Sequence, residues 1–236
     1  MGSKTVLVTD YVWPSVEPEI KVLAKYGVDL LVAPDGNENT LVEMVKEVDG
    51  ILTCFAKVTK KVVEAAKNCK VIGRYGVGVD NIDISAATRR GVVVMNTPDA
   101  NTISAAEHTM ALILAISRNI SYGHEAISKG EWNRHKLIGS ELRNKTLGIV
   151  GLGKIGREVL QRSQAFNMKI LGYDPYVNQD LFNPKEVEVV LLDELGDFSR
   201  AILVALVSLH GKNPKPSSKD IEKFIEERIY QGKRNK

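Results

Sequence analysis

The sequence predicts an α/β protein made of two Rossmann-like or flavodoxin-like parallel-sheet domains, the second of them truncated. Three observations favour this fold class. Strand and helix patterns alternate with short connections through the first hundred residues, which is typical of a parallel sheet. A turn-rich break follows at 96–100. A strand–helix–strand unit at 145–174 then begins a second sheet around a glycine-rich turn.

The first hundred residues alternate apolar strand patterns with helical patterns. Pro14 and Pro18 open the first helix, which carries Ile20, Leu23 and Ala24 on one face. The expected strands are 5–10, 28–33, 51–54, 71–72 and 92–95, and the further helices are 41–48, 60–68 and 84–90. These elements complete one α/β layer structure, so we expect a first domain over residues 1–98.

The second half of the chain begins with a long helical pattern at 103–118 that has small residues near its start. Residues 121–140 are polar apart from Trp132, and we expect them to be irregular. The second domain is expected over 99–211, followed by a divergent helical tail over 212–236. Three interpretations of this amphipathic tail stay open: a helix docked on the sheet, a partner-binding helix, or a poorly ordered extension.

A G-x-G-x-x-G sequence follows the apolar run 146–150 and opens a helical pattern. Its members are Gly151, Leu152, Gly153, Lys154, Ile155 and Gly156. The first glycine permits a tight turn, the second lets a pyrophosphate approach the backbone, and the third lets the helix pack on the strand. The free N–H groups at the helix N-terminus attract phosphate. This arrangement predicts a dinucleotide site, and the alternative is a glycine-rich turn that serves packing alone.

An acidic residue ends the next strand, 169–173. Asp174 lies 18 residues after Gly156, close to the separation of about 20 at which a carboxylate accepts the ribose hydroxyls. No arginine directly follows it to bind a 2′-phosphate. The sequence therefore favours NAD over NADP.

A second glycine-rich loop, 73–81, follows the strand at 71–72, at the end of a parallel sheet where such folds bind ligands. Its glycines let backbone N–H groups converge on an anion. Arg74 is suited to a bidentate contact with a carboxylate or phosphate. The other interpretation is a tight loop in which Arg74 pairs with a nearby acid.

The bulk composition excludes several classes of partner. A net charge of +3 on 236 residues is too weak and too dispersed to indicate nucleic-acid binding. The longest apolar runs fall short of the roughly 20 residues of a membrane span. Cys54 and Cys69 follow no metal-binding or redox spacing, so we expect reduced structural thiols in a cytoplasmic protein.

Together these segments resemble the NAD-dependent D-2-hydroxyacid dehydrogenase family, and most closely its phosphoglycerate dehydrogenase branch. The similarity covers about residues 4–178. The segments that carry it are VIGRYGVGVDNIDISAATRRGVVVMNTPDANTISAAEHTMALILAISRNI (71–120), GEWNR (130–134), ELRNKTLGIVGLGKIGREV (141–159) and LGYDPY (171–176).

The resemblance implies a role for several residues. The loop residues Gly76, Val77 and Gly78 would present amides to the substrate carboxylate, with Arg74 beside them. Ser104 would lie close to NAD, as would Asp174 and the following Pro175. Family members commonly dimerise through their coenzyme domains, and residues 117–141 would contribute to such an interface.

The sequence also departs from the family. These enzymes use a His as acid/base, a Glu that orients it and an Arg that clamps the substrate, within patterns such as N-x-A-R-G-G, D-V-F-x-x-E-P and P-H-x-G. None of these patterns occurs here, and the last histidine is His210. His108 is expected to be a half-buried helix residue, and His124 and His135 surface residues. No catalytic residue and no metal site is therefore assigned.

Two functions and a further possibility stay open. The first is hydride transfer between NAD and a 2-hydroxy acid or the matching 2-oxo acid, impaired because the family's Arg, Glu and His are absent. The second is a non-catalytic NAD-binding or scaffolding module that forms a homodimer through its coenzyme domain. The third is a truncated product with no function of its own.

Overall fold

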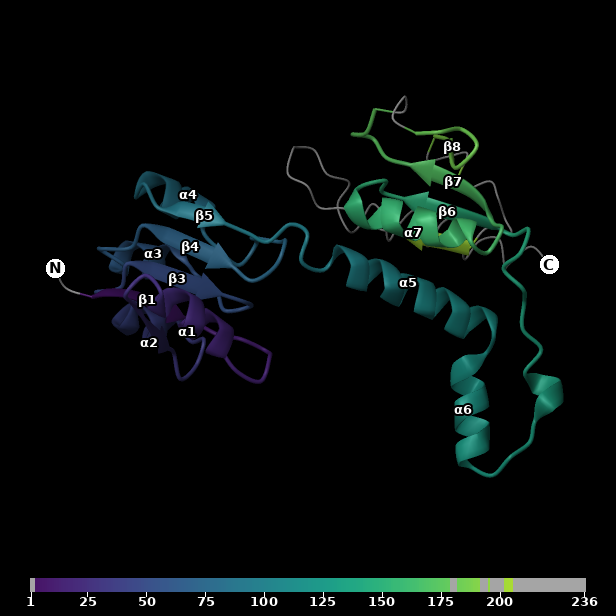
Figure 1. Ribbon diagram of the computed structural model, residues 1–236, viewed down its shortest axis with the longest axis horizontal. Coiled ribbons are helices and arrows are strands. Elements are labelled where there is room, and N and C mark those ends of the chain that lie inside the picture. Colours follow the sequence, from purple (N-terminus) through teal and green to yellow (C-terminus); the bar gives the residue numbers. More distant parts are fainter. Residues whose placement is uncertain (1–2, 179–181, 192–194, 196–201, 206–236) are drawn as a thin grey trace. The chain divides into compact units, whose positions relative to one another are not determined.

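A computed structural model describes residues 3–178, 182–191, 195 and 202–205. The chain forms two compact units, Met1–Ala100 and Asn101–Lys236. Each unit contains its own parallel sheet (Figure 1). The predicted tail at 212–236 and His210 lie outside the described residues.

The first unit is built on a five-stranded sheet in the order β2-β1-β3-β4-β5. All neighbouring strands in it are parallel. The strands are β1 (Lys4–Val8), β2 (Val28–Val32), β3 (Gly50–Thr53), β4 (Val71–Arg74) and β5 (Val93–Met95). Because the strands are parallel, the loops that follow β1, β3 and β4 all leave from the same edge of the sheet.

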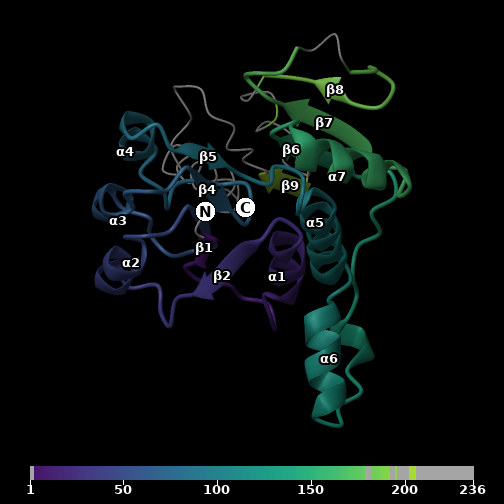
Figure 2. The same cartoon turned by 60° about the vertical axis from the view of Figure 1, so that its left-hand side comes forward.

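Four helices connect these strands: α1 (Glu17–Ala24), α2 (Glu38–Met44), α3 (Lys60–Ala65) and α4 (Ile84–Arg89). Figure 2 shows α2, α3 and α4 along one face of the sheet and α1 on the other. The core lies on the side of the three helices, where Leu41, Val62 and Ala87 pack against strand residues Ile51 and Ile72. No residue of α1 is buried, so that face of the sheet carries little of the core.

The second unit holds a four-stranded sheet in the order β8-β7-β6-β9, again with parallel pairs throughout. Its strands are β6 (Thr146–Val150), β7 (Lys169–Tyr173), β8 (Glu188–Val189) and β9 (Ile202–Ala205). Two helices, α5 (Thr102–Ser117) and α7 (Lys154–Gln164), pack against each other beside the sheet (Figure 1). Ala106 and Met110 of α5 and Val159 of α7 share one buried cluster with Leu147 and Ile149 of β6.

The segment between α5 and β6 differs from the sequence-based expectation. Residues 121–140 were predicted to be irregular, but the structure contains helix α6 (Ile120–Ser128) and a short 3-10 helix, η1 (Arg134–Lys136). Asn119 separates α5 from α6 with a left-handed φ of 53°, a conformation that Asn tolerates better than most residues. The prediction was wrong because α6 does not follow the usual pattern of a packed helix: its apolar residues Ile120, Tyr122 and Ile127 are all more than half exposed, and none of its residues is buried.

The predicted fold class is confirmed by these two parallel sheets with helical connections. Among the helices of the described residues, none has the length and apolar character that a membrane crossing requires.

Candidate functional site

The turn between β6 and α7 depends on two glycines. Gly151 has a φ of 99° and donates a hydrogen bond from its N–H to the carbonyl oxygen of Tyr173, at 2.7 Å. Gly156 is buried on the first turn of α7, and a Cβ atom there would lie 2.0 Å from the Gly151 carbonyl oxygen. No side chain fits at such a distance. The helix therefore starts directly against the end of the strand.

This turn leaves backbone donors free. The N–H groups of Gly153 and Ile155 have no acceptor in the described part of the chain, and Gly153 is the residue that precedes α7. Leu152 is fully buried under the turn, whereas Lys154 is exposed. Free N–H groups at the positive end of a helix dipole are the features with which proteins bind phosphate anions.

Asp174 lies beside the same turn, at the carboxyl end of β7. Its Oδ2 accepts a hydrogen bond from the N–H of Leu152 at 2.9 Å, and its Oδ1 accepts one from Tyr176 at 2.8 Å. The carboxylate is thus held next to the glycine turn by the backbone. Pro175 is exposed directly after it. This position gives the glycine turn a neighbouring carboxylate, which is the arrangement that dinucleotide-binding folds use for the ribose.

Helix α5, which carries Ser104, packs alongside α7. Met110 Sδ lies 3.5 Å from the hydroxyl of buried Ser163, and Glu107 pairs with Arg162 at 3.4 Å. Ser104 is exposed and lies one turn before Glu107 on α5. These contacts of α5 are with the C-terminal residues of α7, whereas the glycine turn precedes that helix, so the place of Ser104 beside the cofactor stays a prediction.

In the first unit, the loop after β4 is held at both ends. The N–H of Tyr75 donates to Thr53 at 2.9 Å, and the N–H of Thr97 donates to the carbonyl oxygen of Gly76 at 2.9 Å. Asn96 donates from its side chain to Val77, at 2.8 Å. Gly76 has a φ of 140°, a backbone conformation in which a residue with a side chain would be strained.

The free donors of this loop are fewer than the sequence suggests. The N–H of Gly76 is taken by the carbonyl oxygen of Arg74, at 2.9 Å. The N–H groups of Val77 and Gly78 have no acceptor among the described residues. Two adjacent free N–H groups still match one carboxylate.

Arg74 lies across the loop and does not extend from it. Its Nη1 donates to the carbonyl oxygen of Tyr75, its Nε is buried without a partner, and its guanidinium carbon lies 5.6 Å from the centre of the Phe55 ring. A Cβ atom on Gly76 would overlap the guanidinium. The cation is therefore partly used by the protein itself.

Asp10 supports the neighbouring loop after β3. Its carboxylate accepts hydrogen bonds from the N–H groups of Cys54 at 2.9 Å and Phe55 at 2.7 Å, and from the Thr9 hydroxyl at 2.8 Å. Partial burial opposes ionisation, but these hydrogen bonds prevail and lower the pKa of Asp10. The pKa of Tyr75 is raised, first by burial and then by the carboxylates of Glu19 and Asp10.

The described histidines do not form a catalytic group. His108, His124 and His135 are all exposed. In the described part of the chain, no cluster of His, Cys, Asp and Glu is suited to hold a metal ion.

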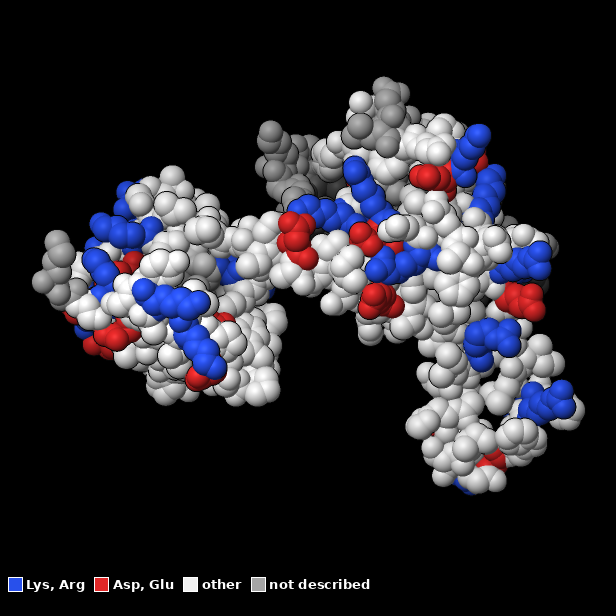
Figure 3. Space-filling model, viewed as in Figure 1, with Lys and Arg blue, Asp and Glu red and all other residues white. Residues whose placement is uncertain are grey.

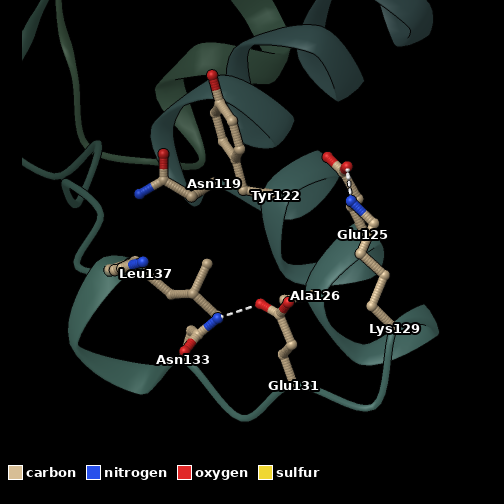
Figure 4. Close-up of a pocket in the computed structure, with 9 residues that line it drawn as sticks. Asn119, Tyr122, Glu125, Ala126, Lys129, Glu131, Asn133 and Leu137 are labelled. Carbon is tan, nitrogen blue, oxygen red and sulfur yellow. Dashed lines mark hydrogen bonds and ion pairs between the residues drawn. The ribbon is translucent and has the colours of Figure 1, made fainter.

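A pocket of about 420 Å³ lies between α6 and the segment around η1 (Figure 4). Two pairs of its polar residues contact each other: Lys129 contacts Glu125 at 2.6 Å, and Asn133 donates a hydrogen bond to Glu131. Apolar residues on the surrounding arm, 116–138, are instead exposed: Trp132 and Ile138 are each 82% exposed and Ile116 is 77% exposed. Figure 3 shows acidic and basic groups interspersed along the visible face of both units.

Two family models match the chain. Residues 6–134 match the model described as D-isomer specific 2-hydroxyacid dehydrogenase, catalytic domain, and residues 110–215 match the NAD binding domain of the same family. The chain belongs to the D-isomer specific 2-hydroxyacid dehydrogenase family. The expected resemblance and the expected cofactor, NAD, are thereby confirmed at the level of the family.

Individual relatives agree with this family. A D-3-phosphoglycerate dehydrogenase of Methanocaldococcus jannaschii is 46% identical over 186 residues, which cover 78% of this chain and 35% of that protein. Another, of Archaeoglobus fulgidus, is 41% identical over 214 residues, covering 88% of this chain and 41% of that protein. The chain thus spans well under half the length of these relatives.

Solved structures show the same fold. The NAD-dependent formate dehydrogenase of Staphylococcus aureus, solved in complex with NAD, superposes with a TM-score of 0.79 at 27% identity, covering 96% of this chain and 70% of that one. The TT0316 protein of Thermus thermophilus superposes with a TM-score of 0.76 at 29% identity, covering 87% of this chain and 65% of that one.

Sequence reasoning missed several residues around the loop after β4. Asp10 and Trp13 come from the loop after β1 and Phe55 comes from the loop after β3, and they meet here because β1, β3 and β4 are consecutive in the sheet. Trp13 packs edge-to-face on Tyr75, with ring centres 4.7 Å apart. The available signal was the position of each residue just after a strand, which a parallel sheet turns into proximity.

Proposed function

We propose that this chain is the NAD- and acid-binding part of a phosphoglycerate dehydrogenase-like oxidoreductase, which transfers hydride between NAD and a 2-hydroxy acid. The observation that carries the proposal is the glycine turn. There Gly156 packs against Gly151, the N–H groups of Gly153 and Ile155 have no acceptor among the described residues, and Asp174 lies next to them. NAD would supply the redox chemistry, and the protein would position its two ends.

In this proposal the second unit binds the cofactor and the first unit binds the acid. Gly151–Gly156 bind the pyrophosphate, Asp174 accepts the adenosine ribose hydroxyls, and Pro175 and Ser104 line the cofactor site. The N–H groups of Val77 and Gly78 bind the carboxylate of the acid.

We further propose that the 236-residue chain turns over its 2-hydroxy acid slowly. None of the family patterns that supply Arg, Glu and His occurs in them, and the described histidines are exposed. A missing general acid/base costs about 10²–10⁴ in rate. A lost arginine clamp would add to that deficit.

A second candidate function is a non-catalytic NAD-binding module that self-associates. The observation in its favour is the arm 116–138, which exposes Ile116, Trp132 and Ile138. We propose that a second copy of the chain covers this arm, giving a homodimer through the coenzyme unit. The two free, buried thiols Cys54 and Cys69 suit the reducing setting of the cytoplasm, which is the proposed location.

The test of the proposed function is an NADH fluorescence titration run beside an absorbance assay with 2-hydroxy acids that include 3-phosphoglycerate. Binding with slow turnover supports the oxidoreductase proposal. Binding without turnover favours the non-catalytic module. Failure to bind NADH rejects both proposals.

A further inference from the structure

The loop that would hold the substrate carboxylate is bordered by aromatic rings. Tyr75 directly precedes Gly76, Trp13 packs on Tyr75, and Tyr11 lies 6.1 Å from Trp13 between ring centres. On the other side, Phe55 lies over Arg74 and is 65% exposed. A phenyl ring left open over Arg74, at the start of the loop whose Val77 and Gly78 N–H groups have no acceptor among the described residues, is available to contact the rest of a bound acid.

The charges around the same loop disfavour a second anionic group. Arg74 is the loop's own cation, and it is turned onto Tyr75 and Phe55. The ionised carboxylate of Asp10 holds the adjacent loop, because it accepts hydrogen bonds from the N–H groups of Cys54 and Phe55.

A further carboxylate lies on the other side of the loop. The Oδ2 of Asp80 is 3.5 Å from where a Cβ of Gly78 would be. One carboxylate of a ligand is matched by the N–H groups of Val77 and Gly78. A phosphate on the same ligand would meet these acids at short range, where like charges repel by an amount that water only partly screens.

We propose that the acid bound at Val77 and Gly78 carries an apolar, preferably aromatic, side chain and no second anionic group. Phe55 is then the specificity-determining residue. This inference rests on the proposed function, because it concerns the same acid site. It departs from phosphoglycerate, the substrate named in the relatives.

Lys57 is the group that could work against this inference. It is exposed and lies two residues after Phe55 on the same loop, so it is the natural counterion for a phosphate if the site accepts one. The test must therefore include a variant of Lys57.

The experiment compares two 2-hydroxy acids, D-3-phenyllactate and D-3-phosphoglycerate. A Trp132→Phe background leaves Trp13 as the remaining tryptophan of the two in the chain, so its fluorescence reports on binding near Tyr75. Calorimetry of the same protein, with and without saturating NADH, gives the affinities. NADH binding is measured first, so that a failure of the cofactor site is seen separately from a failure of the acid site.

Phenyllactate should bind at least about tenfold more tightly than phosphoglycerate and should change the Trp13 emission. Phe55→Ala should weaken phenyllactate by about two- to tenfold, the range of one aromatic contact, and leave D-glycerate unchanged. Tyr26→Ala is the matched control, because Tyr26 is an exposed aromatic residue before β2, at the opposite edge of the sheet, and it should change nothing.

Three results would overturn the inference. The first is tighter binding of phosphoglycerate, lost in Lys57→Ala. The second is an unchanged phenyllactate affinity in Phe55→Ala. The third is the absence of any Trp13 response to either acid, with or without NADH, which would remove the acid from this loop altogether.

Discussion

The close approach of α7 to the end of β6 makes Gly156→Ala a decisive substitution. The new Cβ would lie 2.0 Å from the Gly151 carbonyl oxygen and 3.0 Å from its carbon, whereas ordinary contacts begin at 3.4 Å. The helix start and the turn must therefore separate by more than about 1 Å. Overpacking of this kind costs about 1–3 kcal/mol, or roughly 3–10 °C in melting temperature for a unit of this size.

The same displacement should abolish cofactor binding, because it moves the N–H groups of Gly153 and Ile155 away from the phosphate. We expect NADH affinity to fall by more than about tenfold, measured by fluorescence titration, with the helical circular dichroism retained at low temperature. Gly123→Ala is the control: this helical glycine of α6 has Leu137 at an ordinary 3.7 Å, so alanine should be neutral or stabilising by up to about 1 kcal/mol. A Gly156→Ala protein that melts like the wild type and binds NADH within twofold would refute the packing described here.

Three further predictions concern other parts of the chain. Asp174→Asn should weaken NADH binding by about tenfold with little change in melting temperature, since it loses an acceptor but keeps the backbone contacts of β7; an unchanged dissociation constant would remove Asp174 from the cofactor site. Asp10→Asn should lower the free energy of unfolding by about 1–2 kcal/mol at pH 7. Because the pKa of Asp10 is lowered in the folded protein, its stabilisation is present above about pH 4 and is lost as the pH falls through the folded value. Urea titrations of the two proteins should therefore give free energies of unfolding that converge in acid. A constant difference between these free energies down to about pH 2 would contradict this. Trp132→Asp with Ile138→Asp should convert the proposed dimer to a monomer in light scattering, and a dimer that persists would place the interface elsewhere.

The sequence predicted the parts of the fold whose signals are local. The glycine spacing, the apolar run before it and the acid after the next strand each impose a backbone geometry, and the structure places Gly151, Gly156 and Asp174 together at one turn. The strands of the first unit were equally visible, since buried parallel strands are short, continuous apolar runs.

The parts that escaped prediction depend on contacts between distant residues. Helix α6 was missed because its apolar residues face outward, so it shows no buried stripe. The behaviour of Arg74 was also beyond the sequence: its type suggested a clamp for an anion, but its neighbour Phe55 and the carbonyl oxygen of Tyr75 are partners that the fold brings together. A residue type defines what a side chain can do, and the surrounding loops decide what it does.

The most direct test of the central claim is the stoichiometry and affinity of NADH binding to the 236-residue chain, measured by isothermal titration calorimetry with NADPH as the comparison. Our account predicts one NADH per chain, binding that is lost in Gly156→Ala, and weaker binding of NADPH, because Asp174 would meet the 2′-phosphate. Absence of NADH binding, or equal binding by Gly156→Ala, would contradict the assignment of the glycine turn as the cofactor site.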